Sequence, residues 1–82
     1  MHIQVKLFAL LRETAGADTV TLELPESANA GQALQALSQS HPALRPYLEN
    51  VRLALNMDFV DADAGLDDGD ELHLIPPVSG GV

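Results

Sequence analysis

Aliphatic residues recur at every second position in four separate stretches of the chain. This period predicts strands with one buried face, because successive side chains of a strand point to opposite sides of a sheet. The four stretches cover residues 1–8, 19–24, 51–56 and 71–75. A fifth, shorter strand is predicted at 59–60, after a turn at 56–58. A chain with this pattern has to form a sheet and cover one face of it.

One longer stretch has the period of a helix instead. At the start of this stretch, Asn29 and Gln32 have the spacing of a capping box. Downstream, His41 precedes Pro42, and a residue before proline avoids helical angles, so the helix should end there. A helical turn or two is expected at 9–15, and an irregular connection at 43–50. The apolar positions of the main helix share one face: Ala30, Ala33, Leu34 and Leu37.

The order of these elements predicts an α+β fold. The first two strands are close in sequence, so they should pair antiparallel, and a right-handed crossover through the helix should bring a later strand parallel to the first. The predicted architecture is a mixed sheet with one main helix packed on one face. Ubiquitin-like β-grasp folds have this arrangement.

The composition narrows the possible functions. A chain of 82 residues has room for one domain. It has no cysteine, which excludes a disulfide scaffold, a thiolate metal site and a cysteine nucleophile. Twelve acidic residues against four basic ones give a net charge of −8, which disfavours nucleic acid and anionic membranes and suits a basic protein surface. The longest strongly apolar run, residues 7–11, is too short for a membrane span or a signal-peptide core, so a cytoplasmic protein is expected.

No side-chain catalytic site or metal site is predicted. The three histidines, His2, His41 and His73, lack the spacing of a metal-binding pair. The segment 58–71 holds seven acids and no base, but Leu66 stands where a calcium loop requires glycine and Leu72 stands where it requires glutamate. This segment is interpreted as a solvated loop that could also steer a basic partner.

The C-terminal stretch is the strongest functional signal. Pro76 and Pro77 cannot donate backbone hydrogen bonds, so they end the last strand and stiffen the exit from the sheet. Ser79, Gly80 and Gly81 follow, and glycine lets the backbone approach another surface closely. Any chemistry in this stretch would use the main-chain carboxylate after activation, and composition alone does not separate this from a frayed glycine-rich terminus. We therefore divide the chain into a domain at 1–75 and a tail at 76–82.

Almost the whole chain resembles the small subunit family of molybdopterin synthase, the β-grasp sulfur carriers of molybdenum cofactor synthesis. The similar segments are residues 5–13, 22–25, 41–44, 55–56 and 68–71. The most specific segment is 75–81, Ile-Pro-Pro-Val-Ser-Gly-Gly, because a diglycine end alone is shared by many ubiquitin-like proteins.

The resemblance implies a function. An adenylating enzyme of the ubiquitin-activating type would use ATP to activate the carboxylate of Gly81, and sulfur would then replace the adenylate to give a thiocarboxylate. The tail of Pro76, Pro77, Val78, Ser79 and Gly80 would enter the active site of the large synthase subunit, where sulfur passes to a pterin precursor. The isolated chain would be a sulfur donor and not a catalyst, with no stably bound cofactor. The family also implies a heterotetramer of two small and two large subunits.

Phe8 and Ile75 are apolar residues at outward positions of strands that should be neighbours. They suggest a hydrophobic docking patch for these partners. The alternative is that the segment around Tyr47 packs over them.

Val82 departs from the family, whose members usually end at the second glycine. Three explanations are open. Val82 is removed before activation, or it is an appended residue or the start of a longer fused chain, or the protein has lost the carrier role. One of the first two is favoured. Two rival functions remain open: a related sulfur carrier for thiamin, tRNA thiolation or a tungsten cofactor, and a ubiquitin-like interaction module without tail chemistry.

Overall fold

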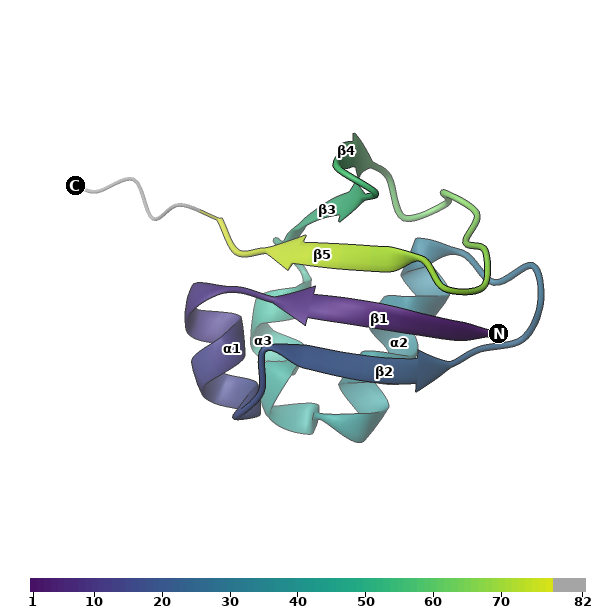
Figure 1. The fold of residues 1–82 in the computed structure, drawn as a ribbon. Coiled ribbons are helices and arrows are strands. Elements are labelled where there is room, and N and C mark those ends of the chain that lie inside the picture. The colour runs from purple at the N-terminus through teal and green to yellow at the C-terminus, as the bar shows by residue number, and fades with distance from the viewer. Residues whose placement is uncertain (78–82) are drawn as a thin grey trace.

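A five-stranded mixed sheet organises the computed structural model, which describes residues 1–77. The order across the sheet is β2-β1-β5-β3-β4 (Figure 1). The strands agree with the predicted ones to within two residues at each end. Their bounds are β1 His2–Leu7, β2 Thr19–Glu23, β3 Arg52–Leu55, β4 Asp58–Val60 and β5 Glu71–Ile75.

The pairing of the strands places β5 in the middle of the sheet. β1 pairs antiparallel with β2 and parallel with β5, while β3 pairs antiparallel with both β5 and β4. The predicted antiparallel start and the predicted parallel crossover are both confirmed. The last strand in sequence therefore ends between two neighbours, and the tail leaves from the centre of the sheet.

The main helix, α2, spans Ala30–Ser40 and begins with the predicted capping box. The amide of Gln32 donates to Asn29 Oδ1 at 2.9 Å, and the amide of Asn29 donates to Gln32 Oε1 at 2.9 Å. These bonds satisfy two of the backbone groups that a helix start otherwise leaves unpaired. The helix stops at His41, as predicted.

The expectation of an irregular connection at 43–50 is wrong in part. A 3-10 turn, η1 at Pro42–Leu44, leads directly into a short helix, α3 at Arg45–Leu48. Each of these elements has a proline in its first turn, where the ring presets helical angles and the missing N–H would have no intrahelical partner. The same residue type that ends α2 thus begins the turns that follow.

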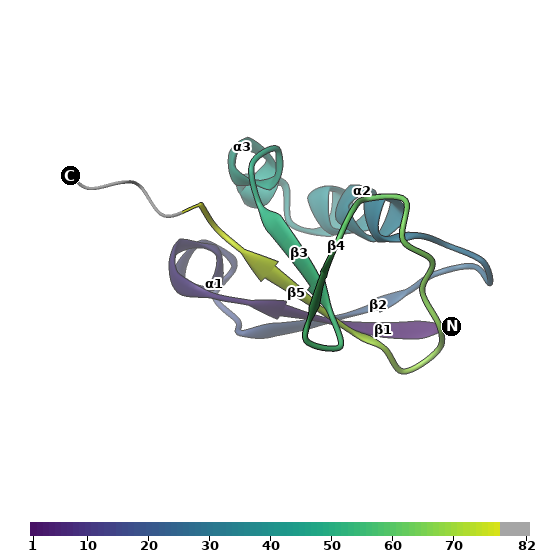
Figure 2. The same ribbon diagram turned by 90° about the horizontal axis from the view of Figure 1, so that it is seen from above.

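The helices cover one face of the sheet and leave the other uncovered. Figure 2 shows α2 and α3 on the same side of the strands, and α1 (Ala9–Ala15) packs against η1. The core lies between these layers and consists almost wholly of aliphatic side chains. Its largest fully buried members are Ile3, Val5, Leu7, Leu11, Leu37, Leu44, Leu72 and Leu74.

Ala54 is buried on the uncovered face, because the alternation along β3 points it away from the side on which Leu53 joins the core. Its Cα partners are His73 on one side and Phe59 on the other. Both neighbours carry larger side chains, so the small methyl group between them is shielded from solvent.

A two-residue turn joins β3 to β4. Asn56 has a φ of 50° and Met57 a φ of 79°, and positive φ at both central residues is the geometry of a type I′ hairpin turn. Asparagine adopts such angles easily, whereas methionine does so only at a cost. The side chain of Met57 is 85% exposed at the tip of this hairpin.

Candidate functional site

The root of the tail lies at the end of the central strand. β5 ends at Ile75, and Pro76 and Pro77 follow it without a backbone N–H to continue the ladder. The remaining tail residues assigned from the sequence, Val78, Ser79, Gly80 and Gly81, lie outside the described residues. Their roles, and the division of the chain at residue 75, stay predictions.

Exposed aromatic residues flank the tail root on the uncovered face. Phe8 follows β1 and is 42% exposed, and it comes directly after Leu7, whose Cα partner is Leu74. Phe8 and Ile75 are therefore at the same level of adjacent strands. Because Phe8 is exposed, the segment around Tyr47 does not cover it.

Phe59 adds a third apolar side chain that the sequence interpretation did not assign. It lies on β4 opposite Ala54 and is 66% exposed. Antiparallel partners point to the same face, so the outward position of Ala54 also determines that of Phe59. The alternation of side chains along the β3–β4 hairpin could have indicated the outward position of Phe59 from the sequence. We call Phe8, Ile75 and Phe59 the tail-root patch.

A polar row crosses the centre of the same face. His73 on β5 lies beside the Phe8 ring with the centroids 5.5 Å apart, and its Nε2 is 3.2 Å from Glu71 Oε1. His73 is also the Cα partner of Lys6 on β1 and of Ala54 on β3. His73 therefore links the aromatic part of the patch to the charged residues beside it.

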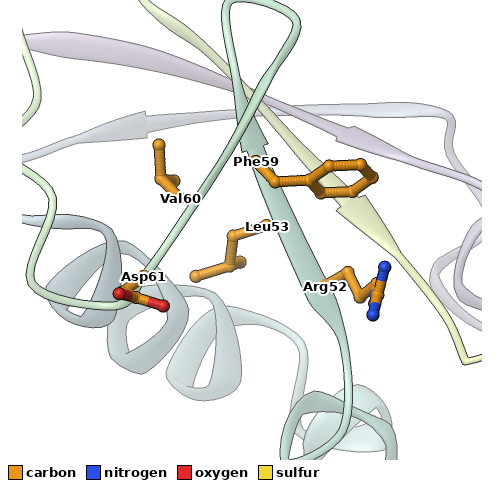
Figure 3. Close-up of a pocket in the computed structure, with 5 residues that line it drawn as sticks. All are labelled: Arg52, Leu53, Phe59, Val60 and Asp61. Carbon is orange, nitrogen blue, oxygen red and sulfur yellow. The ribbon is translucent and has the colours of Figure 1, made fainter.

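Arg52 lies over the Phe59 ring, with its guanidinium carbon 5.4 Å from the ring centroid. This distance is that of a cation–π contact. Figure 3 shows the two side chains at one side of a pocket of about 360 Å³, with Asp61 on the far side. A second, adjoining groove of about 410 Å³ is lined by Arg52, Phe59, Ile75, Pro76 and Pro77. The tail root thus forms one wall of an open groove.

The acidic segment between β4 and β5 forms hydrogen-bonded turns. Asp68 Oδ1 accepts from the amide of His2 at 2.7 Å, and Asp70 Oδ2 accepts from the amide of Asp67 at 2.8 Å. Gly69 between them has a φ of 87°. Within residues 1–77, no three histidine, aspartate or glutamate side chains are grouped so that they could hold a metal ion. The geometry gives these carboxylates a structural role in the turns.

A mixed sheet with helices on one face, and with the chain leaving from its central strand, defines a ubiquitin-like β-grasp protein. The chain belongs to the ThiS family, which matches residues 5–81.

Its relatives include sulfur carriers and protein modifiers. The chain is 42% identical to a molybdopterin synthase sulfur carrier subunit of Chlamydomonas reinhardtii, with 99% of this chain and 100% of the relative covered. The crystal structure of SAMP1 from Haloferax volcanii superposes with a TM-score of 0.91 at 36% identity, covering 99% of this chain and 100% of that one.

A complex of subunits 1 and 2 of the molybdopterin-converting factor of Helicobacter pylori contains a similar chain. The TM-score is 0.69 at 29% identity, with 99% of this chain and 100% of that chain covered. In the described part of the present chain, no helix is long and apolar enough to cross a membrane.

Proposed function

We propose that this chain is the sulfur carrier subunit of a molybdopterin synthase. The observation that carries the proposal is the position of the tail root, at the end of the central strand and beside the tail-root patch. A partner that docks on this patch receives the tail directly. The identity to molybdopterin synthase sulfur carrier subunits over almost the whole chain supports the same function.

The chemistry takes place at the carboxylate of Gly81, which becomes free when water hydrolyses the peptide bond to Val82. A carboxylate oxygen attacks the α-phosphorus of ATP, pyrophosphate leaves, and an acyl-adenylate forms on an adenylating enzyme of the ubiquitin-activating type. A hydrosulfide ion then attacks the acyl carbon and displaces AMP, which leaves a thiocarboxylate on Gly81. The thiocarboxylate sulfur bonds to a carbon of the pterin precursor, and water then hydrolyses the acyl–sulfur bond, so the sulfur stays on the pterin and the tail returns to a carboxylate. ATP is used by the activating enzyme, and this chain binds no cofactor of its own.

The large synthase subunit supplies the catalytic groups in this proposal. The side chains that follow Pro77 are Val78, Ser79, Gly80 and Gly81, and none of them is an acid, a base or a strong nucleophile. The missing Cβ of glycine suits a narrow channel. The isolated chain is therefore a sulfur donor, and the working assembly is a cytoplasmic heterotetramer of two small and two large subunits.

The mass of the intact protein tests this function. The protein is purified from its native host, and its mass is compared with the sequence mass of a chain that ends at Gly81. A form in which sulfur replaces one oxygen, absent after deletion of the gene for the adenylating enzyme, is the expected result. A tail that never carries sulfur, in cells that are actively making molybdenum cofactor, would overturn the proposal.

A second candidate is protein modification, favoured by the similarity to the small archaeal modifier protein 1 of Haloferax volcanii at 38% identity. The same adenylated carboxylate would then be attacked by an amine of another protein, with loss of AMP. Conjugates that retain the tail, detected in the native host by mass spectrometry, would distinguish this use from sulfur transfer.

A further inference from the structure

Three of the four basic side chains of the chain gather around the tail root. Lys6 lies on β1 as the Cα partner of His73, and Arg12 lies on α1, one turn after Phe8. Arg52 lies on β3 as the Cα partner of Ile75. The fourth, Arg45, lies on α3 and donates from Nε to the carbonyl of Ser38 at 3.2 Å.

The three cations border the tail-root patch on two sides. Lys6 and Arg12 line a shallow pocket of about 220 Å³ together with Phe8, and Asp18 and Thr19 also contribute to its wall. On the other side, Arg52 lines the groove formed by Phe59, Ile75 and the two prolines. An apolar centre with a cationic border therefore surrounds the point where the tail leaves.

None of these cations is neutralised within the described part of the chain. Among residues 1–77, the one contact within 4.0 Å between a basic and an acidic side chain joins His73 and Glu71. Lys6 Nζ donates instead to the hydroxyl of Thr19 at 3.2 Å. Asp18 and Asp61 line the neighbouring pockets without reaching a base. Acids outnumber bases twelve to four in this chain, yet within residues 1–77 no carboxylate lies within 4.0 Å of the bases at the tail root.

Most of the acids lie elsewhere. The second half of the loop between β4 and β5 carries Asp67, Asp68 and Asp70, and it lies at the end of the sheet where β1 begins (Figure 1), where Asp68 Oδ1 accepts from the amide of His2. β5 runs from that end to the tail root. The net charge of −8 is therefore unevenly distributed: acids are concentrated at the end of the sheet where β1 begins, and bases are concentrated around the tail-root patch.

We propose that the tail-root face docks on a surface of the synthase large subunit that is apolar at its centre and acidic at its rim. Carboxylates of that rim pair with Lys6, Arg12 and Arg52, while the tail-root patch fills the centre. This inference rests on the proposed function. The net charge of this chain suggests a basic partner surface, whereas the bases at the tail root favour an acidic one. Rim charges of this kind fix the register of docking and accelerate association.

Charge reversals test the inference. The full chain and its R12E and R52E variants are titrated with the purified large subunit, at about 50 mM and about 500 mM salt, because added salt screens rim charges. R45E is the matched control, since it makes the same change in net charge on α3, which lies with α2 on the covered side of the sheet (Figure 2). Thermal unfolding of each variant verifies that the fold is intact.

We expect R12E and R52E each to weaken binding by roughly three- to tenfold at low salt and by less at high salt. R45E should change the dissociation constant by less than half as much. Equal effects of the three variants, or tighter binding by R12E and R52E, would overturn the acidic rim while leaving the proposed function intact. If the unmodified chain itself does not bind the large subunit, the proposed function fails, and this docking mode fails with it.

Discussion

Phe8 and His73 pack their rings with centroids 5.5 Å apart, across the parallel pair of β1 and β5. The contact lies on the face that no helix covers. Phe8 is nevertheless 42% exposed, so its contact with His73 leaves a large part of the ring open to solvent. An exposed aromatic ring on an uncovered face is typical of a residue that completes its packing against a partner.

Replacing Phe8 by alanine should weaken binding of the large subunit about tenfold or more, because exposed aromatic anchors dominate interface energies. Calorimetric titration measures the change. Tyr47→Ala is the control, since Tyr47 lies on α3 and is similarly exposed at 36%. A Phe8→Ala chain that binds as tightly as the Tyr47→Ala chain would remove Phe8 from the docking patch.

In a chain that ends at residue 81, Gly81→Ala should leave the free energy of unfolding unchanged and reduce formation of the thiocarboxylate. The added methyl group obstructs the approach of the terminal carboxylate to the activating site. Mass spectrometry after incubation with the adenylating enzyme, ATP and a sulfur donor gives the modified fraction. Gly65→Ala is the matched control, because a Cβ at Gly65 would meet no atom within 4 Å. Normal sulfur loading of the Gly81→Ala chain would count against a mechanism at the terminal glycine.

Asn29→Ala should lower the free energy of unfolding by about 1 kcal/mol, the usual cost of losing a helix N-cap. Chemical denaturation measures the loss. Gln32→Ala removes the reciprocal bond of the capping box, and the double variant should lose less than the sum of the single losses, because each bond positions the other. Strictly additive losses would show that the two bonds act independently.

Met57→Gly should raise the free energy of unfolding by about 1 kcal/mol, because glycine adopts positive φ without the steric cost that methionine bears. Met57→Ala keeps the Cβ and should give no such gain, which makes it the control. Denaturation curves of the two variants give the difference. A Met57→Gly chain no more stable than the Met57→Ala chain would mean that the turn stores little strain.

Leu74→Ala should cost about 3 kcal/mol, because it leaves a cavity in the fully buried centre of β5. Leu10→Ala removes the same atoms from a side chain that is 45% exposed, and it should cost less than about 1 kcal/mol. Both losses are read from unfolding in denaturant. Similar costs at the two positions would contradict the assignment of β5 to the core.

The periodic parts of this chain could be predicted from sequence. Period-two alternation located the strands because the aliphatic residues of each strand face one covered side, and the capping box located the start of α2. The turns at 42–48 could not be predicted in this way. Proline disfavours a helix before it and favours a helix after it. A proline-rich segment is therefore compatible both with an irregular connection and with the start of a new helix.

The tail-root patch was predicted only in part. Phe8 and Ile75 stood out as apolar residues at outward positions, whereas Phe59 lies in a three-residue strand that is too short to show a period. Arg52 gave no signal because its importance comes from its neighbours, Ile75 across the strand pair and Phe59 on the hairpin. Such neighbours are far apart in sequence, and only the register of the sheet brings them together.

The central place of β5 has a consequence for how the protein is made. β1–β2 and β3–β4 are local antiparallel pairs that can form early, but β5 alone joins them, and it is the last strand to leave the ribosome. Contacts that span most of the chain form slowly. The joined sheet, with Phe8 beside Ile75, therefore exists only in chains synthesised at least as far as β5. A prematurely terminated chain would lack both the tail and the surface that presents it, so incomplete products would not compete for the partners of the finished protein.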